Sequence, residues 1–196
     1  MTATRLLTLN HRLNVLGLIS SALLLYTALS DRPWWTVYGG IGDERTFSAD
    51  VSPFVVTVEV LGKPVTVPML FYLNLAARLS VLLAAATTLL GSLLVKRPWS
   101  KHLMSLKGLA LPVLFLAGLS ISLNLAKTFA GVSIPLVGQS VVEFAMNYGG
   151  FRISAETPVT AALAQEYWVA LTAGVLSALA RAIHGRISQL RRATAL

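Results

Sequence analysis

The sequence contains no cysteine, and it has few charged residues of either sign. The absence of cysteine excludes disulfides, thiolate nucleophiles, iron–sulfur clusters and cysteine-ligated zinc. Charged residues make up 12% of the 196 residues, about half of the roughly 25% that is usual in soluble domains. Because 55% of the residues are hydrophobic and many of them stand in long runs, the composition favours an integral membrane protein.

Motifs that carry chemistry are missing as well. There is no GxxxxGK[ST] phosphate loop, and the glycines of segment 39–44 lack a strand-to-helix context. The three histidines, His11, His102 and His184, stand near the ends of apolar segments, which disfavours a haem or copper site inside a helix bundle. The acids have no helical spacing suited to general acid–base catalysis. We therefore predict a protein that is not an enzyme, with no catalytic residues, metal ligands or cofactors.

Four apolar segments are present: 13–29, 69–95, 103–126 and 159–183. Each is close to or above the ~20 residues that a helix needs to cross a bilayer. We therefore expect the fold class to be an all-α integral membrane four-helix bundle, formed as one membrane domain that covers residues 1–196.

The distribution of charge predicts how these segments are oriented. The N-terminus, the connection between the second and third segments, and the C-terminal tail are basic and contain no acid, whereas all 8 acids lie in or beside the other two connections. The positive-inside rule then places both termini in the cytoplasm of a multi-pass cell-membrane protein and the loops 30–68 and 127–158 outside. The net charge of +8 is explained by this topology, so we expect no nucleic-acid partner.

The first outer loop has the composition of a β-hairpin. Segments 54–61 and 64–67 are rich in valine and threonine, and Gly62, Lys63 and Pro64 supply turn chemistry between them. A lone hairpin is marginal in water, whereas three or more strands on a support are stable. We therefore predict a small antiparallel sheet on the outer face.

Two further segments are candidates for strands of this sheet. WWTVY at 34–38 reads as a strand that is followed by a loop at 39–50, and FRIS at 151–154 follows the turn-like NYGG. The second outer loop would then add a strand to a sheet built by the first.

This layout resembles the claudin and peripheral-myelin-protein superfamily of four-span membrane proteins. The similarity consists of short cytoplasmic termini, four helices, a β-rich first outer loop and a shorter second outer loop. Claudins carry a Trp, then Gly-Leu-Trp and two cysteines in the first outer loop. Trp34 or Trp35 corresponds to the first Trp, but the chain has neither Gly-Leu-Trp nor cysteine. The resemblance therefore implies only the layout of a helix bundle with an outer sheet.

Small residues recur at every fourth position in two of the apolar segments. Such rows let helix backbones approach closely in lipid, and we expect the second and fourth segments to pack tightly against each other. The predicted packing residues are Ala76, Ser80, Ala84 and Thr88 in the second segment and Ala170, Gly174 and Ala178 in the fourth.

Several polar and aromatic positions are candidate sites. Arg78, with Asn74 one turn earlier, either lines a cavity or anion site, contacts a partner subunit, or extends its cation to the headgroups. Lys127 and Glu166, at the outer ends of the third and fourth segments, form a candidate ion pair. Trp34 and Trp35, near the outer boundary, are either an outer interface or ordinary packing.

From these features we predict a non-enzymatic four-span membrane protein that acts as a scaffold, adhesion protein or accessory subunit. It would use its outer sheet and helix faces, and its partners would be the lipid bilayer and other membrane proteins or further copies of itself. The alternative is a small homo-oligomeric channel or carrier in which Arg78 lines the path. A third hypothesis is a membrane enzyme or quinone-contacting subunit, which would require a bound cofactor.

Overall fold

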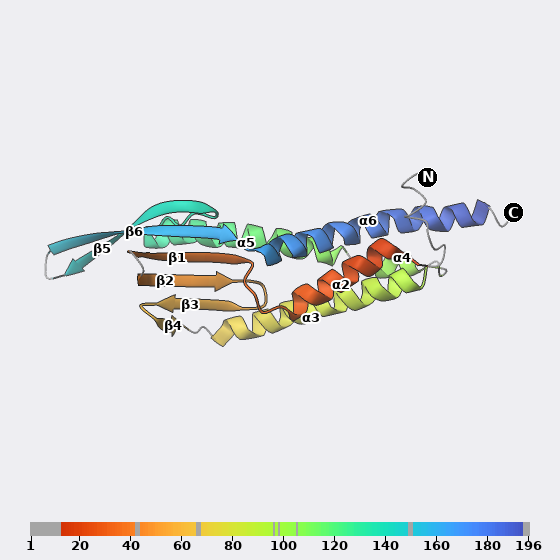
Figure 1. Cartoon of the computed structure of the whole chain (residues 1–196), viewed down its shortest axis with the longest axis horizontal. Helices are drawn as coiled ribbons and strands as arrows, with labels where there is room; N and C mark the ends of the chain where they lie inside the picture. The colour runs from red at the N-terminus through yellow and green to blue at the C-terminus, as the bar shows by residue number, and fades with distance from the viewer. Residues whose placement is uncertain are drawn as a thin grey trace. The chain divides into compact units, whose positions relative to one another are not determined.

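The computed structural model describes residues 13–41, 44–65, 68–95, 97, 99–104, 106–148 and 151–193. Helices and strands both contribute substantially, so the predicted all-α class is too narrow and the fold is mixed (Figure 1). The helices are α2 (Val15–Leu29), α3 (Pro68–Leu93), α4 (Ser100–Leu103), α5 (Lys107–Ala130) and α6 (Gln165–Ala193). The strands are β1 (Trp35–Ile41), β2 (Glu44–Val51), β3 (Val56–Val60), β4 (Lys63–Val65), β5 (Gly138–Tyr148) and β6 (Phe151–Leu163).

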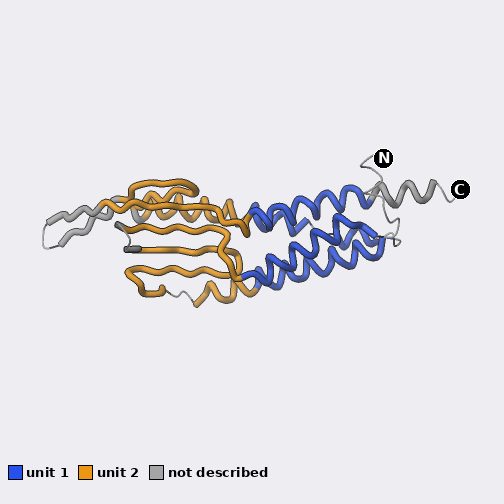
Figure 2. Tube along the Cα trace, viewed as in Figure 1, with its two compact units in different colours: residues 1–30, 76–113, 168–196 blue, residues 31–75, 114–167 orange. Residues whose placement is uncertain are grey.

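The chain divides into two compact units (Figure 2). Unit 1 consists of residues 1–30, 76–113 and 168–196. Unit 2 consists of residues 31–75 and 114–167, and it contains all six strands. The long helices α3, α5 and α6 contribute residues to both units.

The predicted antiparallel sheet is confirmed, and it has six strands in the order β4-β3-β2-β1-β6-β5 (Figure 1). Strands β1 to β4 come from the segment expected as the first outer loop, and β5 and β6 come from the second. The two groups join where β1 pairs with β6, in a register that runs from Trp35 opposite Leu163 to Gly39 opposite Val159.

The predicted hairpin at 54–67 is formed by β3 and β4. Its turn is the pair Leu61 and Gly62, with φ angles of 51° and 72°, and positive φ at both positions is what a type I′ hairpin turn requires. The turn therefore starts one residue earlier than expected. Lys63 and Pro64 lie in β4, an edge strand, where a proline is tolerated because its missing N–H faces no partner strand.

Segment 39–50, expected as a loop, is largely strand, and that prediction was wrong. β1 continues to Ile41, and β2 begins at Glu44. Along β2 the residues Phe47, Ala49 and Val51 pack against the hydrophobic core of unit 2, while polar residues alternate with them. This period of two is that of a half-buried strand, although the polar residues made the segment read as a loop.

The fourth apolar segment does not begin as a helix at Val159. Residues up to Leu163 belong to β6, and α6 starts at Gln165. Val159 and Ala161 are buried in the core of unit 2, and Leu163 packs against it. The expected start of the helix was wrong because a strand with one apolar face and small outward residues is as hydrophobic as a membrane helix.

The third apolar segment also differs from the helix that we expected. Instead of one helix over 103–126, the short α4 ends at Leu103, and α5 runs from Lys107 to Ala130. Met104 between them has an extended backbone.

The core of unit 2 lies between the sheet and the second half of α5. Leu119 is buried there, and Phe115 and Leu123 pack beside it. The side chains that they meet on the sheet are Trp35, Val37, Val142, Val159 and Ala161. One face of α5 is therefore covered by the sheet.

Within unit 1, α2 is held by polar contacts from its first residues onward. Asn14 caps the helix by accepting from the Gly17 N–H at 3.2 Å, and its side-chain amide donates to the Ala180 carbonyl of α6 at 2.9 Å. Its backbone N–H donates to the Ser92 carbonyl of α3 at 3.0 Å. Because Asn14 is 3% exposed, it joins three helices through one buried residue.

By length and composition alone, two apolar stretches are long enough to cross a membrane: Pro68–Leu93 and the stretch 100–129, which contains α4 and α5. Helix α2 is apolar but shorter, at 15 residues.

Candidate functional site

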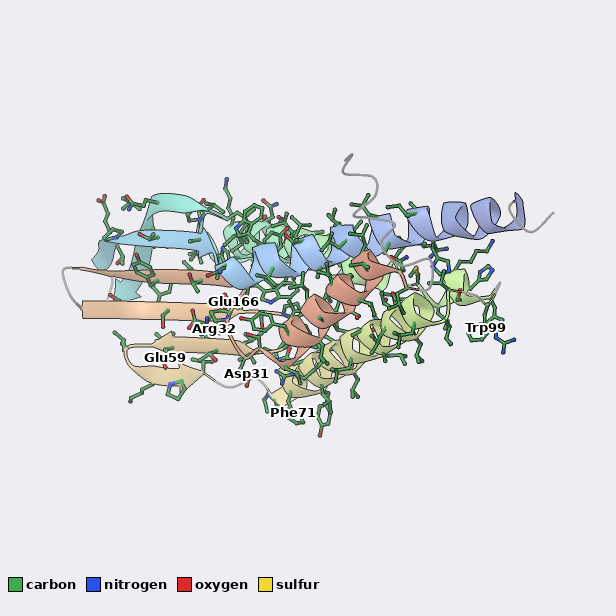
Figure 3. The ribbon with its side chains drawn as sticks, turned by 45° about the vertical axis from the view of Figure 1, so that its right-hand side comes forward. Asp31, Arg32, Glu59, Phe71, Trp99 and Glu166 are labelled. Carbon is green, nitrogen blue, oxygen red and sulfur yellow. The ribbon has the colours of Figure 1, made fainter. Side chains whose placement is uncertain are left out.

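Helix α3 carries its large apolar side chains on the outside and small ones on the inside. Its buried positions are Val81, Ala84, Ala85, Thr88, Gly91 and Ser92. Large residues remain exposed along its whole length, among them Tyr72 at 72% and Leu83 at 59%, and Phe71 projects away from the helix (Figure 3). The exposed α3 face consists of Met69, Phe71, Tyr72, Leu73, Leu75, Leu79, Leu83, Leu89, Leu90 and Leu93. Exposed large apolar side chains in this number are typical of a helix that contacts lipid or another protein.

Helix α5 has a second apolar surface on the side opposite the sheet. Leu114, Ile121, Leu125 and Phe129 are 50% to 83% exposed. Their spacing of seven, four and four residues keeps them on one side of the helix. This exposed α5 face belongs to the part of the helix that lies in unit 2, so an apolar helix surface is present in the unit that contains the sheet.

The two rows of small residues are only partly buried. Ala84, Thr88 and Ser92 of α3 are buried, but Ala76 and Ser80 at the start of the row are exposed. In α6, Ala170 and Gly174 are buried, and Ala178 is half-buried. Two of the four predicted α3 positions, Ala84 and Thr88, are therefore buried, as are two of the three predicted α6 positions, Ala170 and Gly174.

In the closest contacts, the row on α3 meets α2, and the row on α6 meets α5. A Cβ placed on Gly17 of α2 would overlap the Ser92 hydroxyl of α3. A Cβ placed on Gly174 of α6 would lie 2.6 Å from the Leu109 Cα and 2.7 Å from the Gly108 carbonyl oxygen of α5. The contacts therefore join α3 to α2 and α6 to α5, rather than joining the two rows to each other.

Asn74 is anchored to the loop before β3. With its amide oriented so that the nitrogen faces carbonyl oxygens, it donates to Pro53 and to Leu70, each at 3.3 Å. Arg78, one turn later, is half-buried and has an interaction of its own with the described part of the chain. Asn74 therefore has a structural role in unit 2, and the two residues do not form an unsatisfied polar face.

Glu166 pairs with Arg32 and not with Lys127 as predicted. The Arg32 Nη1 lies 3.3 Å from the Glu166 Oε1, with the arginine side chain exposed and the carboxylate nearly buried (Figure 3). The cause lies in the pairing of β1 with β6. Trp35 stands opposite Leu163, and the Ala164 N–H donates to the Trp34 carbonyl at 2.8 Å, so the residues before β1 lie close to the first residues of α6. Lys127 lines a pocket at the end of α5.

The two tryptophans are packing residues, so the outer-interface hypothesis for them was wrong. Trp34 is completely buried, with edge-to-face ring contacts at centroid distances of 5.7 Å to Phe54 and 5.3 Å to Phe115. Trp35 is 3% exposed and donates from its indole nitrogen to the Leu136 carbonyl at 2.6 Å. Aromatic edge-to-face pairs add stability beyond the area that they bury.

Sequence analysis did not select His184 as a site residue, and it is buried in unit 1. Its Nε2 lies 2.7 Å from the Ser100 hydroxyl oxygen, and that hydroxyl also lies 2.7 Å from the Arg97 carbonyl, to which it donates. Nε2 is therefore the donor, and Nδ1 is left without a partner among the described residues. Burial lowers the pKa of His184 below its usual value, so the imidazole is neutral at pH 7.

Comparison with known proteins assigns no family to this arrangement. No protein-family model matches the chain, and no curated protein matches it. In the ranges that the structure describes, no three acidic or histidine side chains lie together as a metal site.

Proposed function

We propose that this chain is a non-enzymatic, multi-pass membrane protein that acts as a scaffold, adhesion protein or accessory subunit. The observation that carries the proposal is the pair of exposed apolar faces on α3 and α5. A chain that places its small residues inside and its large apolar residues outside gains stability only where lipid or another protein covers the outside.

The membrane part of the proposal rests on α3 together with the charge distribution. Large apolar residues are exposed along α3 over 26 residues, a length of roughly 39 Å at 1.5 Å per residue. The acid-free basic segments lie at the chain ends and between α3 and α5, which supports cytoplasmic termini. The strands of the sheet come from the two acid-containing connections. This supports the claudin-like layout, in which two outer loops supply one sheet above a bundle of four helices.

The protein-binding part rests on unit 2. The exposed α5 face lies on a helix whose opposite side already packs on the sheet, so this surface is available to a partner. The sheet also has one long open edge, β5, of 11 residues without proline or lysine. The other edge, β4, is 3 residues long and contains Lys63 and Pro64, which are features that block strand addition. A partner strand would therefore add to β5.

The topology is tested by single-cysteine labelling, because the chain has no cysteine of its own. Glu59→Cys in β3 and Lys101→Cys in α4 both replace exposed residues. A membrane-impermeant maleimide applied to intact cells should label position 59, and it should label position 101 only after permeabilisation. The same labelling pattern at both positions would contradict the proposed orientation.

The function is tested by native mass spectrometry of the protein extracted from its own membrane in a mild detergent. The proposal expects other polypeptides in a fixed ratio, and Ile121→Gln on the exposed α5 face should release them. Thr172→Gln, at an exposed position of α6, is the matched control and should retain them. A protein that is always alone or in a closed homo-oligomer would contradict the proposal, and liposome flux with Arg78→Ala would then test the channel alternative.

A further inference from the structure

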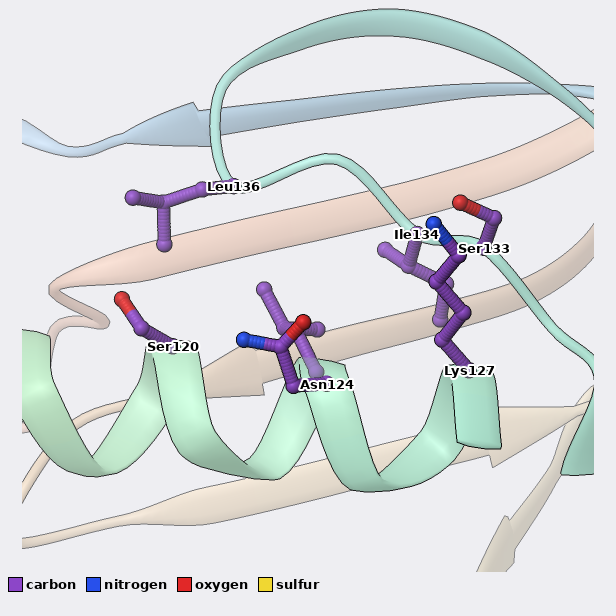
Figure 4. Close-up of a pocket in the computed structure, with 7 residues that line it drawn as sticks. Ser120, Asn124, Lys127, Ser133, Ile134 and Leu136 are labelled. Atoms are coloured by element: carbon purple, nitrogen blue, oxygen red, sulfur yellow. The ribbon is translucent and has the colours of Figure 1, made fainter. Parts of the chain in front are cut away.

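A pocket of about 310 Å³ lies between the last turns of α5 and the irregular segment 131–137 that follows it. Its seven lining residues all belong to unit 2. Figure 4 shows the α5 side chains reaching from the helix toward the segment that carries Ser133, Ile134 and Leu136. The volume is at the lower end of the range of about 300–1,000 Å³ that is usual for small-molecule sites.

Both ends of the segment that covers the pocket are fixed. At its start, Gly131 has a φ of 69°, and its N–H donates to the Lys127 carbonyl at 3.1 Å, which is the left-handed cap that ends α5. At its far end, the Leu136 carbonyl accepts the Trp35 indole N–H, and Ile134 and Leu136 pack against the hydrophobic core. The pocket walls are thus held by the core and do not depend on an occupant.

The polar lining comes from one side of α5 and from the covering segment. Ser120, Asn124 and Lys127 follow each other at intervals of four and three residues, so they share a helix face. Ser133 supplies a hydroxyl from the opposite wall. No acid is among the seven lining residues, and the pocket therefore has a net positive charge from Lys127.

Three of these four polar side chains are not used within the described part of the protein. The Ser120 hydroxyl donates to the Leu116 carbonyl at 2.8 Å. For the side chains of Asn124, Lys127 and Ser133, the structure has no hydrogen bond or ion pair with any residue that it describes. An ammonium, an amide and a hydroxyl are thus available on the walls of one pocket, and each of them is a hydrogen-bond donor.

We propose that this pocket binds a small organic anion. The anionic oxygens, of a carboxylate or a phosphate ester, accept from the Lys127 ammonium, the Asn124 amide and the Ser133 hydroxyl, and such charge-assisted hydrogen bonds are the strong ones. An apolar part of the ligand lies against Leu123, Ile134 and Leu136. The anion is either a free solute or the headgroup of an anionic lipid, since the same donors recognise both.

The simpler role for Lys127 is to complement the negative end of the helix dipole, because it stands in the last turn of α5. That role needs neither Asn124 nor Ser133, and it predicts no saturable binding. The two roles are therefore distinguished by a binding measurement on the full chain.

The experiment uses the full chain in neutral maltoside micelles. Sodium benzoate and inorganic phosphate are titrated by calorimetry up to about 10 mM, well above a dissociation constant of 1 mM, which corresponds to roughly −4 kcal/mol. Phosphatidylglycerol is compared with phosphatidylcholine of the same acyl chains by native mass spectrometry. Lys127→Gln removes the charge and leaves an unbranched polar side chain that is one atom shorter, and Lys63→Gln is the control at another exposed lysine of unit 2.

The proposal expects at least one anionic probe to bind in one-to-one ratio. Lys127→Gln should weaken its binding tenfold or more, while Lys63→Gln changes it less than twofold. Binding of benzoate or phosphate identifies a free solute, and binding of phosphatidylglycerol alone identifies a headgroup. The absence of binding by every probe, or an equal loss in the two lysine variants, would overturn the proposal. Ser133→Leu, which fills the pocket without changing charge, should abolish binding and gives a second, independent check.

Discussion

Gly174 of α6 lies so close to α5 that its replacement by alanine is the sharpest test of the packing in unit 1. The added Cβ would be 2.6 Å from the Leu109 Cα and 2.7 Å from the Gly108 carbonyl oxygen. Carbon atoms in optimal contact are about 3.5–4.0 Å apart, so the two backbones would have to separate by about 1 Å. Both contacts are with backbone atoms of a helix, and no side-chain rotation can relieve them.

The expected cost is that of overpacking, which is typically about 1–3 kcal/mol. Part of it is offset because alanine favours a helix over glycine by up to about 1 kcal/mol. We therefore expect Gly174→Ala to lower the free energy of unfolding by about 1–2 kcal/mol. For a chain of this size, this corresponds to a decrease of roughly 2–8 °C in the unfolding midpoint.

Gly118→Ala is the matched control. Gly118 also lies in a helix, but a Cβ there would meet nothing within 4 Å. Its replacement should leave the unfolding midpoint unchanged or raise it slightly. The midpoints are measured by circular dichroism during heating in one detergent at one protein concentration. A Gly174→Ala protein as stable as the wild type, or a Gly118→Ala protein that is equally destabilised, would refute the proposed contact between α6 and α5.

Three further predictions concern side chains of the two units. Trp34→Ala should lower the free energy of unfolding by about 3–5 kcal/mol, measured by chemical denaturation, because it leaves a large cavity in unit 2. Arg32→Met should cost about 1 kcal/mol, since the arginine is largely solvated, and a double-mutant cycle should show no cost in a Glu166→Gln background. His184 has a lowered pKa in the folded chain, so the unfolded chain binds the proton first as the pH falls. Stability should then decrease as the pH is lowered from about 6.5 through the folded pKa. His184→Gln should flatten the dependence of the midpoint on pH, and an unchanged dependence would show that another group causes it.

The elements that the sequence predicts well are those with a local signal. Asn14, in the first apolar segment, directly precedes α2 at a position where asparagine is a favoured N-cap. The β3–β4 hairpin has alternating valines and a Gly62 turn. Helices α2 and α3 begin and end within two residues of their expected limits. In each case a few neighbouring residues determine the conformation, so the pattern is visible without knowledge of the fold.

The missed strands have a different cause. In β2, Phe47, Ala49 and Val51 alternate with polar residues, and all three are only partly buried, so the signal was weak. In β6, outward-facing residues such as Ala162 are themselves apolar, which hides the alternation and extends the apparent membrane segment. The partner of Glu166 could not be predicted because it depends on the register between strands β1 and β6, which are far apart in the sequence.

The rows of small residues show what the sequence of a single helix can and cannot predict about helix packing. A four-residue spacing identifies which side of one helix admits close approach, and the burial of Ser92 and Gly174 agrees with that. The spacing contains no information about which helix approaches. That choice depends on the other surface, where Gly17 of α2 leaves room for Ser92 and Gly108 of α5 leaves room for Gly174. In each of these contacts, one residue belongs to a row and the other is a glycine outside both rows. The partner helix can therefore be inferred only when the small residues of all the helices are compared together.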